Sequence, residues 1–405
     1  MLKDFYRLKD LGRDDLKKIM RKVLFVTGIR SEYDILYSVI SAVQKKTDME
    51  VGLVVTGAHL SPMYGYTVRE IEKDGFPIIA RIESLLNSDS AVGRVKSAAI
   101  QLSSLIDVFS QYCPSFVVAP MDREEAITVA LAGAYMKIPV VHIGGGDTAA
   151  DGNIDNAVRH AVTKLSHLHM VTTHSSAARV IALGEEPFRV HITGAPGLDR
   201  LVELPDMPAV DLWSRFGYDP EDKPFAVLIQ HSIISDVERA GELMAITIES
   251  LVSLGLPAFV SYPNSDAGSQ EIIEVIETYS KRYPGLFHKY KNLPRLEFVN
   301  LMRRAHVMVG NSSCGIIEAP LFHLPVVNIG PRQRGREHSK NVQFVEHEIT
   351  QIRAAIRRAV FDEEYRRSVD QCVNPYGDGH AGERFADILA AVPIDEKLLF
   401  KRITY

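Results

Sequence analysis

Short apolar runs alternate with longer amphipathic segments along most of this chain. The runs at 22–28, 50–57, 116–120 and 140–143 are too short for helices and indicate buried strands. A polar loop and a stretch with helical spacing of apolar residues follow each of the first three. Strands that alternate with helices in this way predict an α/β fold with a parallel, doubly wound sheet.

A stretch rich in Pro and Asp, 203–223, interrupts this alternation, which then resumes. We therefore expect two Rossmann-like domains with a cleft between them, and a docked amphipathic helix ahead of the first strand. The expected parts are a helical extension at 1–20, a first domain at 21–205, a second domain at 206–380, and a C-terminal helix with its tail at 381–405.

The composition of the chain bears on which kinds of molecule it binds. The 405 residues are 46% hydrophobic and 24% charged, an ordinary balance for a soluble globular protein, and the formal net charge of -5 argues against nucleic acid or an anionic membrane. No apolar run approaches the ~20 residues of a membrane helix, and the charged N-terminus is unlike a signal peptide. Three scattered cysteines fit a cytoplasmic protein without disulfides.

The stretch Gly310–Pro320 follows an apolar run and turns the chain into a predicted helix. Ser312 and Ser313 are candidate N-cap residues, and a helix start with free N–H groups can seat an anion. Glu318, farther along, could accept hydrogen bonds from the hydroxyls of a ribose. The pattern predicts half of a nucleotide site, although a well-capped structural helix would look the same.

Polar side chains also follow the predicted strands of the first domain. Ligands of parallel α/β sheets bind at the carboxyl ends of the strands, so several such residues together indicate a site, although each alone could be a cap or a surface residue. These residues are Arg30, His59, Asp122, Arg123 and His142, and His231 ends a strand of the second domain in the same way.

A loop with three consecutive glycines, Gly144 to Gly146, follows His142. Its glycines would let a ligand approach the backbone, but it lacks the spacing and position of a dinucleotide-binding motif. The helix after it carries several histidines with no supporting carboxylate or cysteine pattern. We therefore expect neither a metal nor a cofactor.

The chain resembles the UDP-N-acetylglucosamine 2-epimerases, and more specifically their hydrolysing branch in sialic-acid-type pathways. The resemblance spans about 21–392 and rests on TGIRSEYD, TGAHL, MDREEA, HIGGGD, GNIDNAVRHAVTKLSHLH, TGAPGLD, QHSIISD, PNSDAGS, GNSSCGIIEAP, IGPRQRGRE and YGDG, in that order. It implies a GT-B type fold, a UDP-sugar substrate and a homodimer or higher homo-oligomer. It also implies anti elimination of UDP to a glycal, then syn addition of water that inverts carbon 2 and frees an N-acetylmannosamine-type sugar.

The resemblance also implies roles for individual residues. Acid/base chemistry falls to Asp122 and Asp155, with Asp147 as a further acid, while His231 contacts phosphate or takes part in catalysis. The expected nucleotide ligands are Arg30, Arg123, Asn264, Ser312, Ser313, Glu318 and Arg332, and the expected sugar-side residues are His59, His142 and Arg159.

Two departures from the family pattern bear on the substrate. Met121 stands where the family usually has glycine, and Gly144 stands where it has an acid. The sugar could thus be N-acetylglucosamine or a diacetamido-trideoxy sugar, on UDP or another nucleotide.

Alternative functions are a nonhydrolysing 2-epimerase, a GT-B glycosyltransferase and a non-catalytic nucleotide-sugar sensor. Ser31-Glu32 and Asn311–Gly315 replace motifs of the nonhydrolysing branch, which favours the hydrolysing one.

Overall fold

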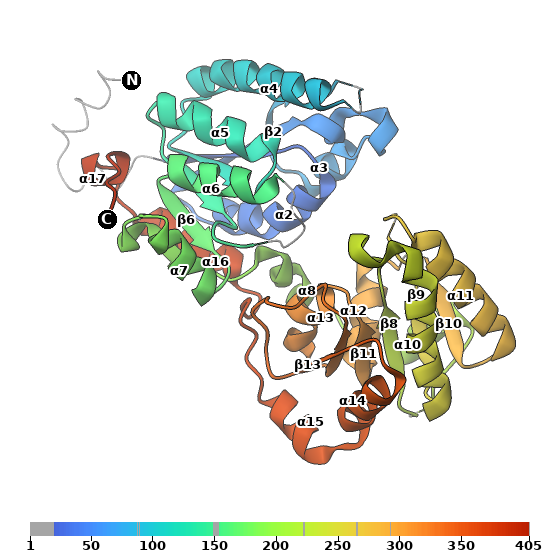
Figure 1. The fold of residues 1–405 in the computed structure, drawn as a ribbon. Coiled ribbons are helices and arrows are strands. Elements are labelled where there is room, and N and C mark those ends of the chain that lie inside the picture. The colour runs from blue at the N-terminus through green and yellow to red at the C-terminus, as the bar shows by residue number, and fades with distance from the viewer. Residues whose placement is uncertain are drawn as a thin grey trace. The chain divides into compact units, whose positions relative to one another are not determined.

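The computed structural model describes residues 20–404 except 87, 89, 149–153, 222, 265 and 292. The helix expected at 1–20 therefore lies almost wholly outside the described residues. The chain forms two compact units, the first comprising residues up to Arg200 together with the segment from Gly377 onward, and the second comprising Leu201–Tyr376. Each unit is built on a parallel sheet with helices between successive strands (Figure 1).

The sheet of the first unit has the strand order β3-β2-β1-β4-β5-β6-β7, and its strands pair in parallel. The predicted strands are found here with small shifts of their ends. Their bounds are β1 (Arg21–Thr27), β2 (Met49–Thr56), β3 (Ile78–Ile82), β4 (Phe116–Pro120), β5 (Val140–Ile143), β6 (Leu168–Val171) and β7 (Val190–Ile192).

Helices cover both faces of this sheet, because alternate residues of the buried strands point to opposite sides. Phe25 and Val51 belong to the cluster that includes α2 and α16, whereas Leu24 and Val54 belong to the cluster that includes α4 and α5. Figure 1 shows these helices around the sheet. The helices are α2 (Arg30–Gln44), α3 (Val68–Asp74), α4 (Ala91–Tyr112), α5 (Glu124–Tyr135), α6 (Asp155–Leu165), α7 (His174–Ala182), α16 (Ala381–Ala391) and α17 (Glu396–Leu399).

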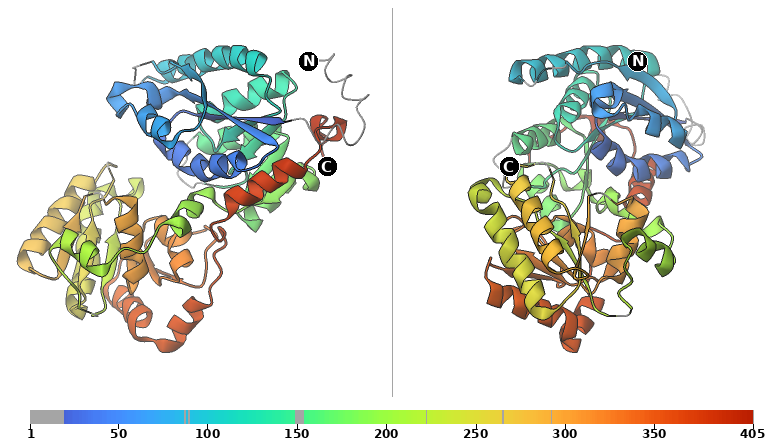
Figure 2. Two further views of the ribbon diagram at one scale, coloured as in Figure 1. Left: turned by 180° about the vertical axis from the view of Figure 1, so that it is seen from behind. Right: turned by 90° about the vertical axis from the view of Figure 1, so that its right-hand side faces the viewer.

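The C-terminal helix α16 lies beside α2, although the two are far apart in the sequence (Figure 2). A Cβ atom on Gly382 would lie 2.6 Å from the backbone oxygen of Ser38, so only glycine allows this close approach. The ring of Phe385 packs 6.3 Å from that of Phe25 on β1. The end of the chain is therefore part of the core of the first unit.

The second unit has the strand order β10-β9-β8-β11-β12-β13, again in parallel pairs. These strands are β8 (Ala226–Ile229), β9 (Ala258–Ser261), β10 (Phe287–Tyr290), β11 (Val307–Gly310), β12 (Val326–Ile329) and β13 (Val342–Val345). The helices are α8 (Asp199–Glu203), which spans the division, then α9 (Ala209–Phe216), α10 (Ala240–Leu254), α11 (Ser269–Arg282), α12 (Arg295–Arg304), α13 (Cys314–Ile317), α14 (Ile349–Phe361) and α15 (Glu363–Asp370).

The two faces of this second sheet are covered by different kinds of side chain. Aliphatic residues of α10, α11 and α14 pack on one face. On the other face Trp213 of α9 stacks on Phe259 of β9 at 5.6 Å between ring centroids. Among the described residues no helix combines the length and apolar character needed to cross a membrane.

The helix predicted after Asn311 differs from expectation. The α-helix α13 is a single turn and continues as a 3-10 turn, Ala319–Phe322. Ser313 occupies its N-cap position without a side-chain capping bond, and Ser312 Oγ accepts instead from the N–H of Cys314 at 3.4 Å. Pro320, which has no N–H to donate, lies at the start of the 3-10 turn, just after the α-helical turn ends.

Candidate functional site

The carboxyl ends of β1, β2, β4 and β5 meet at one edge of the first sheet, because the strands are parallel and adjacent. The ends of these strands and the segments that follow them, up to and including α6, carry the residues predicted for the sugar, His59, His142 and Arg159, and the predicted acids Asp122, Asp147 and Asp155.

Asp122 and Arg159 form the central ion pair of this edge. Asp122 follows β4, and its carboxylate accepts a hydrogen bond from the guanidinium of Arg159 on α6. Only 5% of the Arg159 side chain and 16% of the Asp122 side chain are exposed, so water screens the pair weakly. The same guanidinium donates to the backbone oxygen of Asp147 at 2.8 Å and to Asn156 Oδ1 at 2.8 Å. Arg159 thus ties β4, the glycine loop and α6 together.

The three predicted acids lie within electrostatic reach of one another. Burial raises the pKa of Asp122 against the opposing pull of Arg159, and Asp155 and Asp147 raise it further. Asp155 is the first residue of α6, and Asp147 Oδ1 accepts from the N–H of Thr148 at 2.9 Å. A carboxyl group held close to a cation and to other acids at a strand end can exchange a proton with a substrate.

His142 is held on β5 by two protein partners. Its side chain is fully buried, with Nε2 at 2.8 Å from the backbone oxygen of Met121 and Nδ1 at 3.1 Å from Thr163 Oγ1. Burial lowers its pKa to about 3, so the ring is neutral, donates from Nε2 and accepts at Nδ1. In this structure His142 fixes the loop after β4 rather than presenting a ring nitrogen to a ligand.

His59 is held similarly after β2. It is buried, with Nε2 at 3.1 Å from Thr27 Oγ1 and Nδ1 at 2.7 Å from Thr67 Oγ1. Burial lowers its pKa to about 4, so it too is neutral. The sugar-side roles of both histidines therefore stay predictions.

The two predicted arginines of this edge differ in their surroundings. Arg30 is the first residue of α2. Its side chain is 64% exposed, and its Nε lies 3.5 Å from Glu70 Oε2. The Arg123 side chain is 38% exposed, and its Nε donates to Glu125 Oε2 at 3.4 Å. Arg123 is thus the arginine held close to the strand ends by a buried carboxylate.

Sequence reasoning missed a buried pair of carboxyl groups, Glu32 and Glu125. Glu32 Oε2 accepts from the N–H of Gly28 at 3.0 Å, and a Cβ atom on Gly28 would lie 2.2 Å from Glu125 Oε1. Burial raises the pKa of both, and Glu125 raises that of Glu32 further, so they hold protons more tightly than ordinary glutamates. Their position in the sequence could have identified them, since each lies two residues after an arginine that follows a predicted strand.

The glycine loop is packed against protein atoms. Cβ atoms on Gly144, Gly145 and Gly146 would lie 2.6 Å from Met121 Sδ, 3.0 Å from His142 Nδ1 and 2.2 Å from the Ser176 backbone oxygen, respectively. These glycines therefore allow close packing of the strand ends, whereas the sequence suggested approach to a ligand.

Asn311 organises the strand-end loops of the second unit. Its side chain accepts from the N–H of His231 at 2.7 Å and donates to the backbone oxygen of His231 at 2.8 Å. Its own backbone oxygen accepts from Arg332 at 3.1 Å and from Gln333 at 3.0 Å. The N–H of Asn264 donates to His231 Nδ1 at 3.2 Å. The structure thus brings together His231, Asn264 and Arg332, through an asparagine that sequence reasoning did not assign to the site.

The imidazole of His231 is neutral in this arrangement. Burial and the charge of Arg332 lower its pKa, and Nδ1 accepts a hydrogen bond, which leaves Nε2 to carry the proton. A neutral imidazole with a free N–H can donate to a phosphate oxygen.

Ser312, Ser313 and Glu318 are all partly buried around the short helix α13. Burial raises the pKa of Glu318, and Arg295 opposes that rise. The neighbouring Cys314 donates from Sγ to Ser312 Oγ at 2.9 Å, and burial raises its thiol pKa to about 12, which makes it unreactive.

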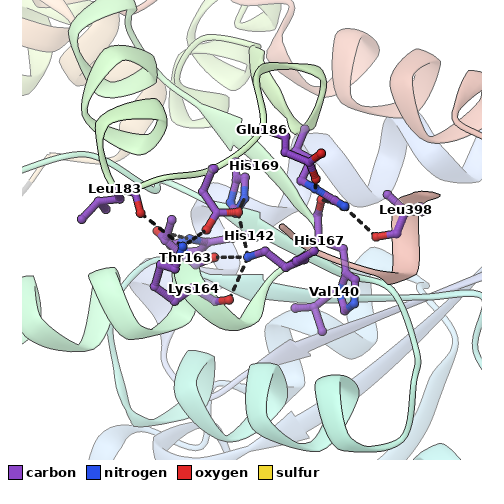
Figure 3. Close-up of polar contacts among 12 residues, drawn as sticks. Val140, His142, Thr163, Lys164, His167, His169, Leu183, Glu186 and Leu398 are labelled. Atoms are coloured by element: carbon purple, nitrogen blue, oxygen red, sulfur yellow. Dashed lines mark hydrogen bonds and ion pairs between the residues drawn. The ribbon is translucent and has the colours of Figure 1, made fainter. Parts of the chain in front are cut away.

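A buried ionic cluster, formed by Lys164, His169, Glu185 and Lys401, lies behind His142 and is linked to it through Thr163 (Figure 3). Lys401 of the C-terminal tail donates to the backbone oxygens of Thr163 at 3.2 Å and of Lys164 at 2.7 Å, and pairs with Glu185 at 2.7 Å. Glu185 also binds Lys164 at 2.7 Å and His169 Nε2 at 3.0 Å. Because Thr163 also bonds to His142, the tail contacts the residue that orients this histidine.

Two histidines of this region, His167 and His169, are bound to protein partners. His167 Nδ1 accepts from the N–H of Val140 at 3.0 Å, and His169 is bound to Glu185. The described parts of the chain contain no group of three or more His, Cys, Asp or Glu arranged to hold a metal ion.

Comparison with known proteins agrees with this architecture. The family model described as UDP-N-acetylglucosamine 2-epimerase matches residues 41–390. The UDP-N,N'-diacetylbacillosamine 2-epimerase (hydrolyzing) of Legionella pneumophila is 35% identical, over 96% of this chain and 100% of its own. The GDP/UDP-N,N'-diacetylbacillosamine 2-epimerase (hydrolyzing) of Campylobacter jejuni is 31% identical, over 84% of this chain and 87% of its own.

A solved structure shows the same fold. The UDP-GlcNAc 2-epimerase of Neisseria meningitidis, crystallised with UDP-GlcNAc, matches with a TM-score of 0.73 at 21% identity, over 91% of this chain and 99% of that one. The two parallel sheets with alternating helices are therefore those of a GT-B-like two-domain α/β protein, as the sequence predicted. The family model and the relatives together establish that this chain belongs to the UDP-N-acetylglucosamine 2-epimerase family.

Proposed function

We propose that this protein is a hydrolysing 2-epimerase of a UDP-linked acetamido sugar, with UDP-N,N'-diacetylbacillosamine as its substrate. The observation that carries the proposal is the 35% identity to a hydrolysing 2-epimerase of that sugar nucleotide over the whole length of the relative. The acids around Arg159 supply the proton-transfer groups that such a reaction needs.

The reaction begins with removal of the proton on carbon 2 of the sugar. The electron pair of the broken C–H bond forms a double bond between carbons 2 and 1. The bond from carbon 1 to oxygen breaks, and UDP leaves with the electron pair of that C–O bond. Water then adds its oxygen to carbon 1, and a proton adds to carbon 2 on the same face as that oxygen, which is opposite to the face that lost the first proton. The products are UDP and a free sugar inverted at carbon 2.

The acid/base steps are assigned to the first unit. Asp122, Asp147 and Asp155 are the candidate groups, and Asp155 is favoured as one member of the acid/base pair. Arg159 holds Asp122 and the backbone of Asp147 in place, which is consistent with proton transfer at a fixed position. Residue 144 has no side chain and can transfer no proton.

Binding of the nucleotide is assigned to the second unit. His231 and Arg332, joined through Asn311, offer a neutral N–H and a cation to a diphosphate whose charge grows as it leaves. Glu318 is assigned to the ribose hydroxyls, and Ser312 and Ser313 to the phosphates.

NMR of the reaction in deuterated water tests the proposal. We expect UDP-N,N'-diacetylbacillosamine to yield free UDP and a free 2-epimerised sugar that carries deuterium at carbon 2. Asp122→Asn should bind UDP as the wild type does but release far less product. An epimerised sugar still attached to UDP would indicate a nonhydrolysing enzyme, and an unchanged spectrum with this and with UDP-N-acetylglucosamine would indicate a binding protein.

A further inference from the structure

Met121 has an unusual backbone conformation at the carboxyl end of β4. Its φ of +57° lies in the left-handed region, which a residue with a side chain seldom occupies. Its N–H donates to the backbone oxygen of Ile143 at 2.9 Å, and its own oxygen accepts from His142 Nε2 at 2.8 Å. Such a disfavoured conformation persists only where its surroundings enforce it, and it is most frequent at functional sites.

Gly144 gives the Met121 side chain its space. A Cβ atom on Gly144 would lie 2.6 Å from Met121 Sδ, closer than non-bonded carbon and sulfur atoms can approach. Gly144 also has a φ of +82°, where any other residue would be strained. The two residues that depart from the family pattern therefore lie against each other, and a side chain at position 144 would displace the Met121 thioether from the place it occupies here.

Met121 lies at the edge of the sheet beside the predicted acids and outside the packed apolar clusters of the described part of the chain. Met121 is partly exposed and adjoins Asp122, which Arg159 binds. None of the hydrophobic clusters formed by the described residues includes it as a buried member or as a packed neighbour. It therefore adds a thioether, an apolar and polarisable group, to an edge that otherwise carries carboxylates and guanidinium groups.

We propose that Met121, accommodated by Gly144, is a specificity-determining residue that contacts a nonpolar substituent of the sugar. This inference rests on the proposed function. A diacetamido-trideoxy sugar carries an acetamido group in place of one hydroxyl of N-acetylglucosamine and a methyl group in place of its hydroxymethyl group. A methyl group packs well against a thioether, whereas a hydroxyl buried there loses its hydrogen bonds to water without replacement.

The test compares kcat/KM for release of UDP from UDP-N,N'-diacetylbacillosamine and from UDP-N-acetylglucosamine. Met121→Gly suits the left-handed backbone and is expected to fold. It should lower the preference for the diacetamido sugar by about 10-fold or more, the usual effect of losing one apolar contact. Met121→Leu should keep most of the preference, and Met121→Gln, which is polar and similar in size, should lose it.

A double substitution tests the contact between the two positions. Gly144→Ala alone should displace the thioether and reduce the preference, while adding Met121→Gly should remove this extra effect of the alanine. The inference is overturned if Met121→Gly leaves the ratio of the two kcat/KM values unchanged, or if Met121→Gln preserves the preference. Failure of the wild type to release UDP from either sugar would instead overturn the proposed function, and this inference with it.

Discussion

Glu185→Gln removes the carboxylate at the centre of the buried cluster behind His142 while keeping the shape of the side chain. Glu185 is completely buried and is paired with Lys164, Lys401 and His169. The replacing amide could still accept hydrogen bonds, but it would leave the two ammonium groups without a compensating charge. Removing one member of a buried ion pair is strongly destabilising for this reason.

The pKa of Glu185 gives the expected magnitude. Its partners lower the pKa from 4.5 to about 2 despite its burial. At 1.36 kcal/mol for a tenfold change in acidity, this lowering of the pKa corresponds to about 3 kcal/mol of stability at pH 7. Because the folded pKa is the lower one, this contribution is present above pH ~4.5 and is lost as pH falls toward 2, with about half remaining at pH 3.

Urea unfolding followed by amide circular dichroism measures this contribution in wild type and variant at pH 7, 4 and 3. We expect the variant to be less stable by about 3 kcal/mol at pH 7 and the difference to shrink at pH 3. The chain's single tryptophan, Trp213, lies in the second unit, so its fluorescence identifies the transition of that unit.

Glu186→Gln is the matched control for this experiment. Glu186 lies next to Glu185, its side chain is 20% exposed, and it binds Arg189, which keeps its bonds to backbone oxygens such as that of Leu398. We expect a smaller loss than for Glu185→Gln, because Glu186 is partly exposed and pairs with one cation that keeps its backbone acceptors. The reasoning is refuted if Glu185→Gln costs no more than Glu186→Gln, or if its cost at pH 3 equals that at pH 7.

Three further predictions concern the site and the N-terminus. Asp155→Asn should fold and bind UDP but lose about a hundredfold or more in turnover, and near-normal turnover with a collapse in Asp147→Asn would transfer the acid/base role to Asp147. Ser313→Ala and Glu318→Ala should each weaken UDP binding by about 1–3 kcal/mol in calorimetry, and unchanged affinity in both would exclude this nucleotide seat. Deletion of 1–20 should lower the melting temperature or dissociate subunits but preserve the rate per site; a tenfold loss of rate with intact mass and melting would place the segment in the site.

Strand and helix positions could be predicted because buried parallel strands have a simple signal. Uniformly apolar runs between Gly- or Pro-containing turns occur only where both faces of a sheet are covered. The ranges predicted at 116–120 and 140–143 agree with those of β4 and β5 in the structure. The prediction after Asn311 was less successful, because good N-cap residues mark where a helix can start and carry no information about its length.

The packing of α16 could not be predicted from local pattern. The sequence suggested a terminal helix after the second domain, and the contact of Phe385 with Phe25 joins residues at opposite ends of the chain. Gly382 does mark the close approach to α2. In the sequence, however, a glycine near a helix start reads as an ordinary local feature, because nothing indicates which backbone it will meet.

In the candidate site, too, the sequence predicts where a residue lies in the sheet but not which side chains surround it. Strand-end position brought His59, His142 and Asp122 to one edge of the sheet, as the topology of a parallel sheet requires. Position does not decide what each side chain meets there, since two threonines occupy the ring nitrogens of His59 and burial keeps His142 neutral. Asp122 instead meets Arg159, which arrives from α6. A residue at a strand end therefore becomes a candidate for chemistry only when its partners leave it a proton to exchange or an atom to offer.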